Sequence, residues 1–231
     1  MKTIGMLGGM SWESTTTYYQ LINRGVQARL GGVHSAKIVM ASFDFAEVSA
    51  LQHAGKWDEA TAMLGDAGAK LAASGADFAM ICCNTMHLLA EGVQARAGIP
   101  FLHIADATGA AIAARGMKRI GLLGSIYTME QGGVIADRLE EKFGLGIITP
   151  NDADRVVIDS VIQDELVRGQ FLEASRAAYR AVMARLVDAG AQGIILGCTE
   201  IPLLVGAGDA PVPLFDTTAL HAAAAVDLAL G

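Results

Sequence analysis

The stretch that decides the fold is Phe78-Ala79-Met80-Ile81-Cys82-Cys83-Asn84-Thr85-Met86-His87. Its apolar first half predicts a buried strand, and a helical pattern follows its polar second half. A thiol would therefore lie where a parallel strand ends and a helix begins. Open α/β sheets bind their ligands at that edge. A lone cysteine, however, often serves only as a small buried hydrophobe.

A second copy of this motif gives the cysteine its significance. Three segments of the first half recur in the second, in the same order and at nearly the same offset: 4–9 as 120–125, 74–85 as 189–200, and 99–103 as 212–216. In the middle pair Cys83 aligns with Cys198 without gaps. Shared glycine and aliphatic patterns explain the first and third matches, but they do not explain a cysteine at the same phase of the same strand.

The repeat predicts an α/β fold class. We expect two similar α/β/α domains with parallel sheets, related by pseudo-two-fold symmetry, with the active site in the cleft between them. The expected domains are 1–105, completed by a terminal helix at 216–231, and 106–215. In the first half, strands are expected over 3–7, 37–42 and 77–82, and helices over 12–30 and 56–74.

The alignment also separates the two adjacent thiols. Successive side chains along a strand point to opposite faces, so Cys82 and Cys83 should point in opposite directions. Cys83 matches Cys198 in the repeat, whereas Cys82 matches Gly197. We therefore assign Cys82 to packing and Cys83 to chemistry.

Composition narrows the possible classes of protein. A chain of 231 residues with 52% hydrophobic residues can form a substantial core, and its net charge of -7 without a basic cluster argues against nucleic acid as a partner. No apolar run approaches the roughly 20 residues of a membrane span, so no membrane association is expected. Three cysteines cannot form a disulfide framework, which suggests a reducing, cytoplasmic location.

Two opposed thiols suit one kind of chemistry better than others. A thiol hydrolase needs one cysteine with a base and an oxyanion site. A redox pair usually has its sulfurs close in sequence, and a metal site wants more ligands than two cysteines, so no metal is expected. Cys83 and Cys198 instead suit removal of a proton from one face of a carbon and return of a proton to the other, which is racemisation or epimerisation.

Such chemistry requires one thiolate and one thiol, together with stabilisation of a carbanion. A free cysteine has a pKa of about 8.5, and the expected helix N-terminus after each thiol would supply partial positive charge. No lysine-based pyridoxal site is evident, so no cofactor is expected. Stabilisation must come from backbone N–H donors and from side chains beside the thiols. Four side chains are placed by sequence for that role: Asn84, Thr85, Thr199 and Glu200.

Paired motifs give the chain a recognisable identity. Gly8-Gly9-Met10, Cys83-Asn84-Thr85-Met86-His87 and Gly197-Cys198-Thr199-Glu200 resemble the cofactor-independent aspartate/glutamate racemase family. The resemblance extends over essentially the whole chain, through residues 104–108, 127–130 and the terminal helix. The two cysteine motifs in order are its most specific part.

The resemblance implies a set of roles. Cys83 and Cys198 would be the acid/base pair, and the family commonly forms homodimers that act on small amino acids. Asn84, Thr85 and Thr199 would hold the α-carboxylate. The remaining implied contacts are Met10 and Thr128 lining the site and Glu200 near the amino group.

The chain departs from the family pattern at one position, and this leaves open which residue contacts the substrate side chain. Aspartate-specific relatives tend to carry an arginine in the loop after the second strand, where it can form a bidentate hydrogen bond with the side-chain carboxylate. Here Gln52 is the best match for that position, and Arg168 is the alternative partner for an anionic side chain. This pattern is closer to relatives with broader amino-acid specificity.

Other interpretations of the same residues remain. His87 could pair with Cys83 as in a thiol hydrolase, although packing near the first helical turn explains it as well. The charged residues from Asp137 to Lys142 are most simply a solvated helix face. Two rival functions are a cysteine-dependent isomerase or decarboxylase of small carboxylates, and a non-catalytic two-lobed carboxylate binder.

Overall fold

The computed structural model describes residues 1–130 and 133–231. Within these residues the strands form two four-stranded parallel sheets, in the orders β2-β1-β3-β4 and β6-β5-β7-β8. Both sheets are covered by helices, so the predicted α/β class is confirmed. The chain separates into two compact units, one of Met1–Ile104 with His221–Gly231 and one of Ala105–Leu220. The division expected from the sequence, into a domain of 1–105 with the terminal helix and a domain of 106–215, stays a prediction.

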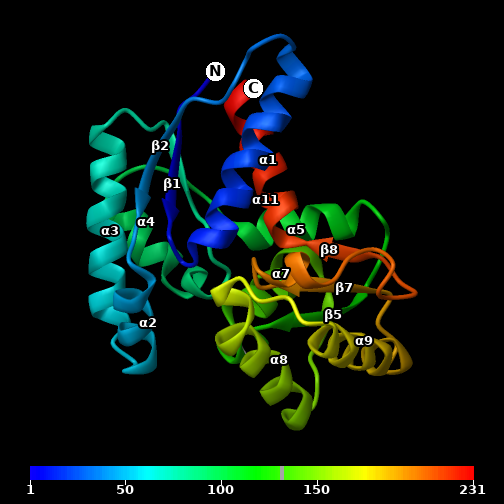
Figure 1. The fold of residues 1–231 in the computed structure, drawn as a ribbon. Coiled ribbons are helices and arrows are strands. Elements are labelled where there is room, and N and C mark those ends of the chain that lie inside the picture. The colour runs from blue at the N-terminus through cyan, green and yellow to red at the C-terminus, as the bar shows by residue number, and fades with distance from the viewer. Residues whose placement is uncertain (131–132) are drawn as a thin grey trace. The chain divides into compact units, whose positions relative to one another are not determined.

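The first unit is built on a sheet with helices on both faces (Figure 1). Its strands are β1 (Ile4–Gly8), β2 (Ile38–Ser42), β3 (Phe78–Ile81) and β4 (Phe101–Leu102). Its helical elements are α1 (Trp12–Leu30), α2 (Phe45–His53), α3 (Trp57–Ala73), the 3₁₀ helix η1 (Thr85–Leu89) and α4 (Ala90–Ala97). Every residue of β1 and β3 is buried, as expected for central strands of a parallel sheet.

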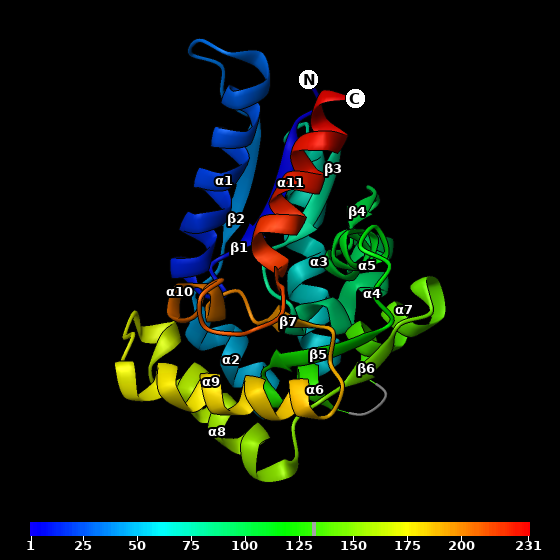
Figure 2. The same cartoon turned by 90° about the vertical axis from the view of Figure 1, so that its right-hand side faces the viewer.

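The last helix, α11 (Thr217–Leu230), lies beside α1, as Figures 1 and 2 both show. Its small residues pack in one apolar cluster with side chains of α1 and β1, including Ala225, Ile22 and Ile4. Because Gly25 has no side chain, α1 can approach Val226 closely: a Cβ there would be 3.0 Å from a methyl group of Val226. The C-terminal helix therefore helps to form the core of the first unit.

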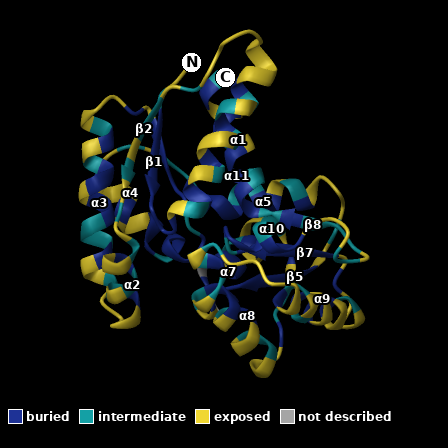
Figure 3. Ribbon diagram, in the orientation of Figure 1, coloured by how far each residue is buried: buried dark blue, intermediate teal, exposed yellow. Residues whose placement is uncertain are grey.

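The second unit repeats this plan with different helices. Its strands are β5 (Arg119–Gly124), β6 (Gly146–Ile148), β7 (Gly193–Gly197) and β8 (Leu214–Asp216). Its helical elements are α5 (Ile104–Ala113), α6 (Ile126–Met129), α7 (Val134–Phe143), α8 (Asp152–Asp164), η2 (Leu166–Arg168), α9 (Glu173–Asp188) and α10 (Ile201–Leu204). As Figure 3 shows, β5 and β7 are buried, while α8 and α9 each have an exposed side.

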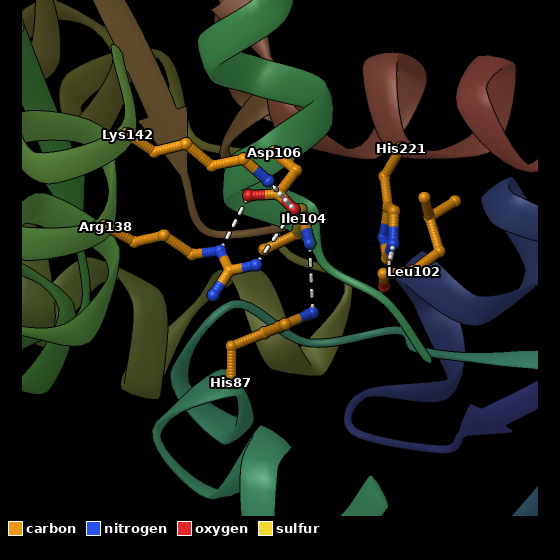
Figure 4. Close-up of polar contacts among 7 residues, drawn as sticks. All are labelled: His87, Leu102, Ile104, Asp106, Arg138, Lys142 and His221. Carbon is orange, nitrogen blue, oxygen red and sulfur yellow. Dashed lines mark hydrogen bonds and ion pairs between the residues drawn. The ribbon is translucent and has the colours of Figure 1, made fainter. Parts of the chain in front are cut away.

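The charged face of α7 is a correction to the sequence-based interpretation. Arg138 and Lys142 are not simply solvated, because both reach Asp106 on α5. The Arg138 guanidinium donates to both carboxylate oxygens, at 2.6 and 2.9 Å, and Lys142 Nζ donates at 2.7 Å (Figure 4). Burial alone would raise the pKa of Asp106, but these partners lower it to about 2. The network ties α5 to α7 within the second unit.

No helix in the described part of the chain is both long and apolar enough to cross a membrane.

The Asp106 network predicts an acid-dependent stability. Replacing Asp106 with Asn should lower the free energy of unfolding by about 1–2 kcal/mol near neutral pH, because it leaves Arg138 without its carboxylate. The Asp106 pKa is about 2 in the folded protein against 3.8 ordinarily. The contribution should therefore be complete above about pH 4 and decline as the pH falls toward 2. Urea titrations of both proteins from about pH 7 to pH 3 measure it.

The control variant is Asp137→Asn, which removes an exposed carboxylate from α7, the helix that carries Arg138 and Lys142. It should leave the free energy of unfolding within about 0.5 kcal/mol of the wild type. A deficit for Asp106→Asn that stays constant between about pH 7 and pH 3 would show that the carboxylate charge is not its cause.

Candidate active site

In the first unit, strand pairing brings a glycine loop next to the cysteine loop. Leu7 of β1 pairs with Ile81 of β3 in parallel register, and the Cys82 N–H donates to the Leu7 carbonyl at 2.9 Å. The chain beyond each strand therefore emerges at the same edge of the sheet. Gly8-Gly9 and Cys83 are neighbours for this reason.

The glycine loop has no room for side chains. Gly9 has a φ of 85°, and a Cβ at this residue would lie 2.3 Å from the Phe43 carbonyl oxygen. Its N–H donates to Thr15 Oγ1 at 2.9 Å, and the Thr15 hydroxyl in turn donates to the Ser11 carbonyl at 2.7 Å. The loop is thus closed onto the start of α1. The sequence analysis identified the glycines but missed Ser11 and Thr15.

The two adjacent cysteines lie in different environments. Cys82 is fully buried among apolar side chains of β1, α1 and α11, and burial raises the pKa of its thiol well above the ordinary value. Cys83 is partly buried and packs against the separate cluster that contains Met10 and Met86. The two side chains belong to opposite faces, as the alternation along a strand predicts. Of the two thiols, Cys83 is the accessible one.

The element after Cys83 is a short 3₁₀ helix rather than the expected start of a regular helix. In an α-helix the His87 N–H would donate to the Cys83 carbonyl, but here it donates to Asn84 O at 3.0 Å. The Cys83 carbonyl instead lies 2.8 Å from Nδ1 of the His87 ring. Because η1 has only five residues, helix-dipole stabilisation of a Cys83 thiolate is weaker than the sequence analysis assumed.

The other predicted residues of this unit are buried at or near the same edge. Asn84 and Thr85 are 3% and 9% exposed, and Met10 lies in the apolar core at 2%. Gln52 is a correction, because it lies in α2 and not in a loop after β2. Asp44 caps this helix by accepting from the Ala46 N–H at 3.0 Å, a signal that the sequence analysis missed.

The second unit brings its own glycine and cysteine loops together. Gly124 of β5 pairs with Gly197 of β7, and Thr128 packs over both, since a Cβ at Gly124 would lie 2.9 Å from Thr128 Cβ. Ser125 caps α6, and its hydroxyl lies 3.1 Å from Thr128 Oγ1. The structure thus places the predicted residue Thr128 beside β7, the strand that leads to Cys198.

A buried carboxylate accepts a hydrogen bond from the second thiol. Cys198 Sγ donates to Glu200 Oε2 at 2.9 Å, and the Thr199 hydroxyl donates to the same oxygen at 3.0 Å. Glu200 is 2% exposed and accepts both hydrogen bonds through this one oxygen. A neighbouring negative charge disfavours a thiolate. The geometry therefore favours Cys198 as a protonated thiol.

Arg168, the alternative partner for a substrate side chain, ends η2 and is followed by Gly169 with a φ of 70°. Its side chain is 64% exposed, and its guanidinium lies 3.8 Å from the Asp164 carboxylate. Within residues 1–130 and 133–231 no group of three or more His, Cys, Asp or Glu side chains could hold a metal ion.

Comparison with known proteins agrees with these motifs. Residues 7–225 match the family model described as Asp/Glu/Hydantoin racemase. The chain belongs to the Asp/Glu/hydantoin racemase family. It is accordingly an enzyme of the isomerase class, and its family acts on small amino-acid substrates.

Three solved structures resemble the chain over nearly its whole length. An Asp/Glu racemase candidate from Yersinia pestis is 52% identical, with a TM-score of 0.92 and 100% of both chains covered. An aspartate racemase homologue from Pyrococcus horikoshii OT3 is 30% identical, with a TM-score of 0.85 and 100% of both chains covered. The aspartate racemase of Picrophilus torridus is 19% identical over 99% of this chain and 94% of its own, with a TM-score of 0.79, and so shares the fold.

The Cys198–Glu200 contact predicts the reactivity of one thiol. Glu200→Gln removes the charge that disfavours the Cys198 thiolate, so alkylation of Cys198 by iodoacetamide near pH 7 should accelerate roughly tenfold. The rate at Cys83, measured in the same sample by peptide mass spectrometry, serves as the internal control. An unchanged or slower rate at Cys198 would contradict the proposed role of Glu200.

Proposed function

We propose that this chain is a cofactor-independent amino-acid racemase that acts on aspartate, glutamate or a broader set of amino acids. The reaction would exchange the proton at Cα by a two-base mechanism, with Cys83 and Cys198 as the two bases. One cysteine as thiolate removes the α-proton from one face, and the other as thiol returns a proton to the opposite face. For the opposite enantiomer, the two roles are reversed.

One observation supports this proposal most strongly. In each unit the third strand of the chain leads to a partly buried cysteine at the edge where the glycine loop of the first strand also ends. The adjacent Cys82, by contrast, is enclosed in the core. Matching thiols at matching positions fit a reaction that needs two interchangeable bases, and a single-nucleophile reaction needs only one of them.

The environment of Cys198 suggests which of the two thiols is protonated in the resting enzyme. Because Glu200 accepts a hydrogen bond from the Cys198 thiol, Cys198 would be the acid in the resting state and Cys83 the base. The enantiomer that presents its α-proton to Cys83 could then react without a preceding proton shift. The other enantiomer would first require the proton to move from Cys198 to Cys83.

The predicted binding residues would hold the substrate around these thiols. Asn84, Thr85 and Thr199 are proposed to hold the α-carboxylate and to stabilise the negative charge that develops on it. Met10 and Thr128 would line the site, and Glu200 would lie near the amino group as well as controlling Cys198. Either Gln52 or Arg168 would meet the substrate side chain.

Three further expectations complete the proposal. The enzyme would work as a homodimer in the cytoplasm, and it would need neither pyridoxal phosphate nor a metal. The two compact units would correspond to its two domains. The rival functions, a related isomerase or decarboxylase and a carboxylate binder, share the motifs but not the need for both thiols.

The proposal is tested by chiral analysis of single-enantiomer amino acids incubated with the enzyme and with two serine variants. We expect the wild type to racemise aspartate, glutamate or another amino acid of the panel, and Cys83→Ser and Cys198→Ser each to lower the rate at least a thousandfold, since each removes one base. Cys82→Ser is the matched control. Cys82 is assigned to packing and not to the chemistry, so the folded fraction of this variant should retain activity.

Absence of any second enantiomer with the whole panel would contradict the racemase proposal. Full activity in either the Cys83 or the Cys198 variant would instead indicate a single-cysteine reaction, as the decarboxylase alternative requires.

A further inference from the structure

His87 binds the main chain through both ring nitrogens. Its side chain is buried, and its Nδ1 lies 2.8 Å from the Cys83 carbonyl oxygen. Its Nε2 lies 3.2 Å from the Ile104 backbone nitrogen (Figure 4). A peptide N–H can only donate, so Nε2 must be unprotonated. The ring proton is then on Nδ1, where it is donated to the Cys83 carbonyl. Both contacts are satisfied only by the neutral Nδ1–H tautomer.

We propose that His87 is a positioning residue for the Cys83 half of the active site, acting through the Cys83–Asn84 peptide. This inference rests on the proposed function, because it assigns the Asn84 N–H as a donor to the substrate α-carboxylate. His87 itself does not touch the substrate. It also differs from the thiol-hydrolase interpretation, since neither ring nitrogen is available as a base for Cys83.

The geometry of the peptide bond connects His87 to the carboxylate. A trans peptide is planar, and its C=O and N–H point in opposite directions. By holding the Cys83 carbonyl, His87 fixes the plane of the Cys83–Asn84 peptide and directs the Asn84 N–H away from the imidazole. A hydrogen bond accepted by the carbonyl also polarises the peptide, which strengthens its N–H as a donor. A carboxylate is the ligand that gains most from such a donor.

Neighbouring rings keep His87 in this orientation. The ring centroid of His103 lies 4.6 Å away and that of His221 lies 5.7 Å away. His221 Nε2 donates to the Leu102 carbonyl at 2.9 Å, and its Nδ1 accepts from the Tyr18 hydroxyl at 3.0 Å. Burial, then the neighbouring His87, lowers the pKa of His221 to about 3, so this ring is neutral as well. Figure 4 shows His221 and His87 holding Leu102 and Ile104, two residues apart in one segment.

The second unit has no equivalent of this histidine. At the offset of 115 residues that aligns Cys83 with Cys198, His87 aligns with Pro202, whose side chain cannot donate a hydrogen bond. There the Thr217 hydroxyl donates to the Leu196 carbonyl at 2.9 Å, two residues before Cys198. The effect of His87 should therefore be confined to Cys83, which makes Cys198 an internal reference.

The test compares two alkylating reagents of similar size, anionic iodoacetate and neutral iodoacetamide. Their rate ratio at each cysteine, measured by peptide mass spectrometry, reports how well a carboxylate is held beside that thiol. His87→Asn places an amide donor where Nδ1 was and keeps the bond to the Cys83 carbonyl. His87→Gln places its amide where Nε2 was and keeps only the contact to Ile104. His221→Gln is the matched control, a change in the same buried cluster that leaves the Cys83 carbonyl bound.

We expect His87→Gln to lower the iodoacetate preference at Cys83 roughly fivefold to tenfold, because the variant weakens, but does not remove, one hydrogen bond to a charged group. His87→Asn and His221→Gln should change it less than about twofold, and the ratio at Cys198 should not change in any variant. If His87→Gln does not fold, His87→Asn still decides, because a fivefold loss in that variant overturns the proposal.

Three results would overturn the inference: an unchanged ratio at Cys83 in His87→Gln, equal losses in His87→Asn and His87→Gln, or a parallel loss at Cys198. The labelling requires no turnover, so its outcome is independent of whether the enzyme racemises any amino acid tested. An inactive wild type with the expected labelling would contradict the proposed function and leave the carboxylate-positioning role in place.

Discussion

Parallel pairing between the first and third strands of each sheet is the interaction on which the rest of the structure depends. Leu7 with Ile81 and Gly124 with Gly197 place the ends of two buried strands side by side. In a parallel sheet every strand ends at the same edge. The glycine loop and the cysteine loop, which follow adjacent strands, are therefore neighbours. A slip of one residue in the pairing of β1 with β3 would exchange the faces of Cys82 and Cys83, and it would bury the thiol that is proposed as a base.

The three thiols differ because their surroundings differ, although their backbone positions are similar. Cys82 is enclosed by apolar side chains, which suppress ionisation. Cys198 donates to the buried carboxylate of Glu200, whereas the carbonyl of Cys83 accepts from His87. The repeat is therefore symmetric in its strands and asymmetric in its polar contacts. In the proposed two-base mechanism, such asymmetry would define a resting state in which Cys198 is protonated and Cys83 acts as the base.

Much of the fold could be predicted from local patterns. Helix α1 has the limits expected from the sequence, and each end of α11 lies one residue inside the expected range of 216–231. The internal repeat indicated which cysteine leaves the core, since it compared two copies of one strand. Contacts between side chains that are far apart in the sequence could not be predicted from local patterns. Asp106 and Arg138 are 32 residues apart, and nothing local to α7 indicated that its charges had a partly buried partner on α5. The contact between the His87 ring and the Cys83 carbonyl could not be predicted either. A prediction from helical periodicity assumes that this carbonyl accepts from the backbone N–H of His87, as in an α-helix.

The most direct test of the two-base account follows the α-hydrogen itself. A protiated single enantiomer of an amino acid that the enzyme racemises is incubated in D2O, and both enantiomers are separated early and analysed by mass spectrometry. The account predicts one deuterium at Cα in the newly formed enantiomer and none in the remaining substrate, because one thiol removes the proton and a different thiol delivers the deuteron. Deuterium entering the remaining substrate as fast as the product, or a product that retains protium, would contradict it.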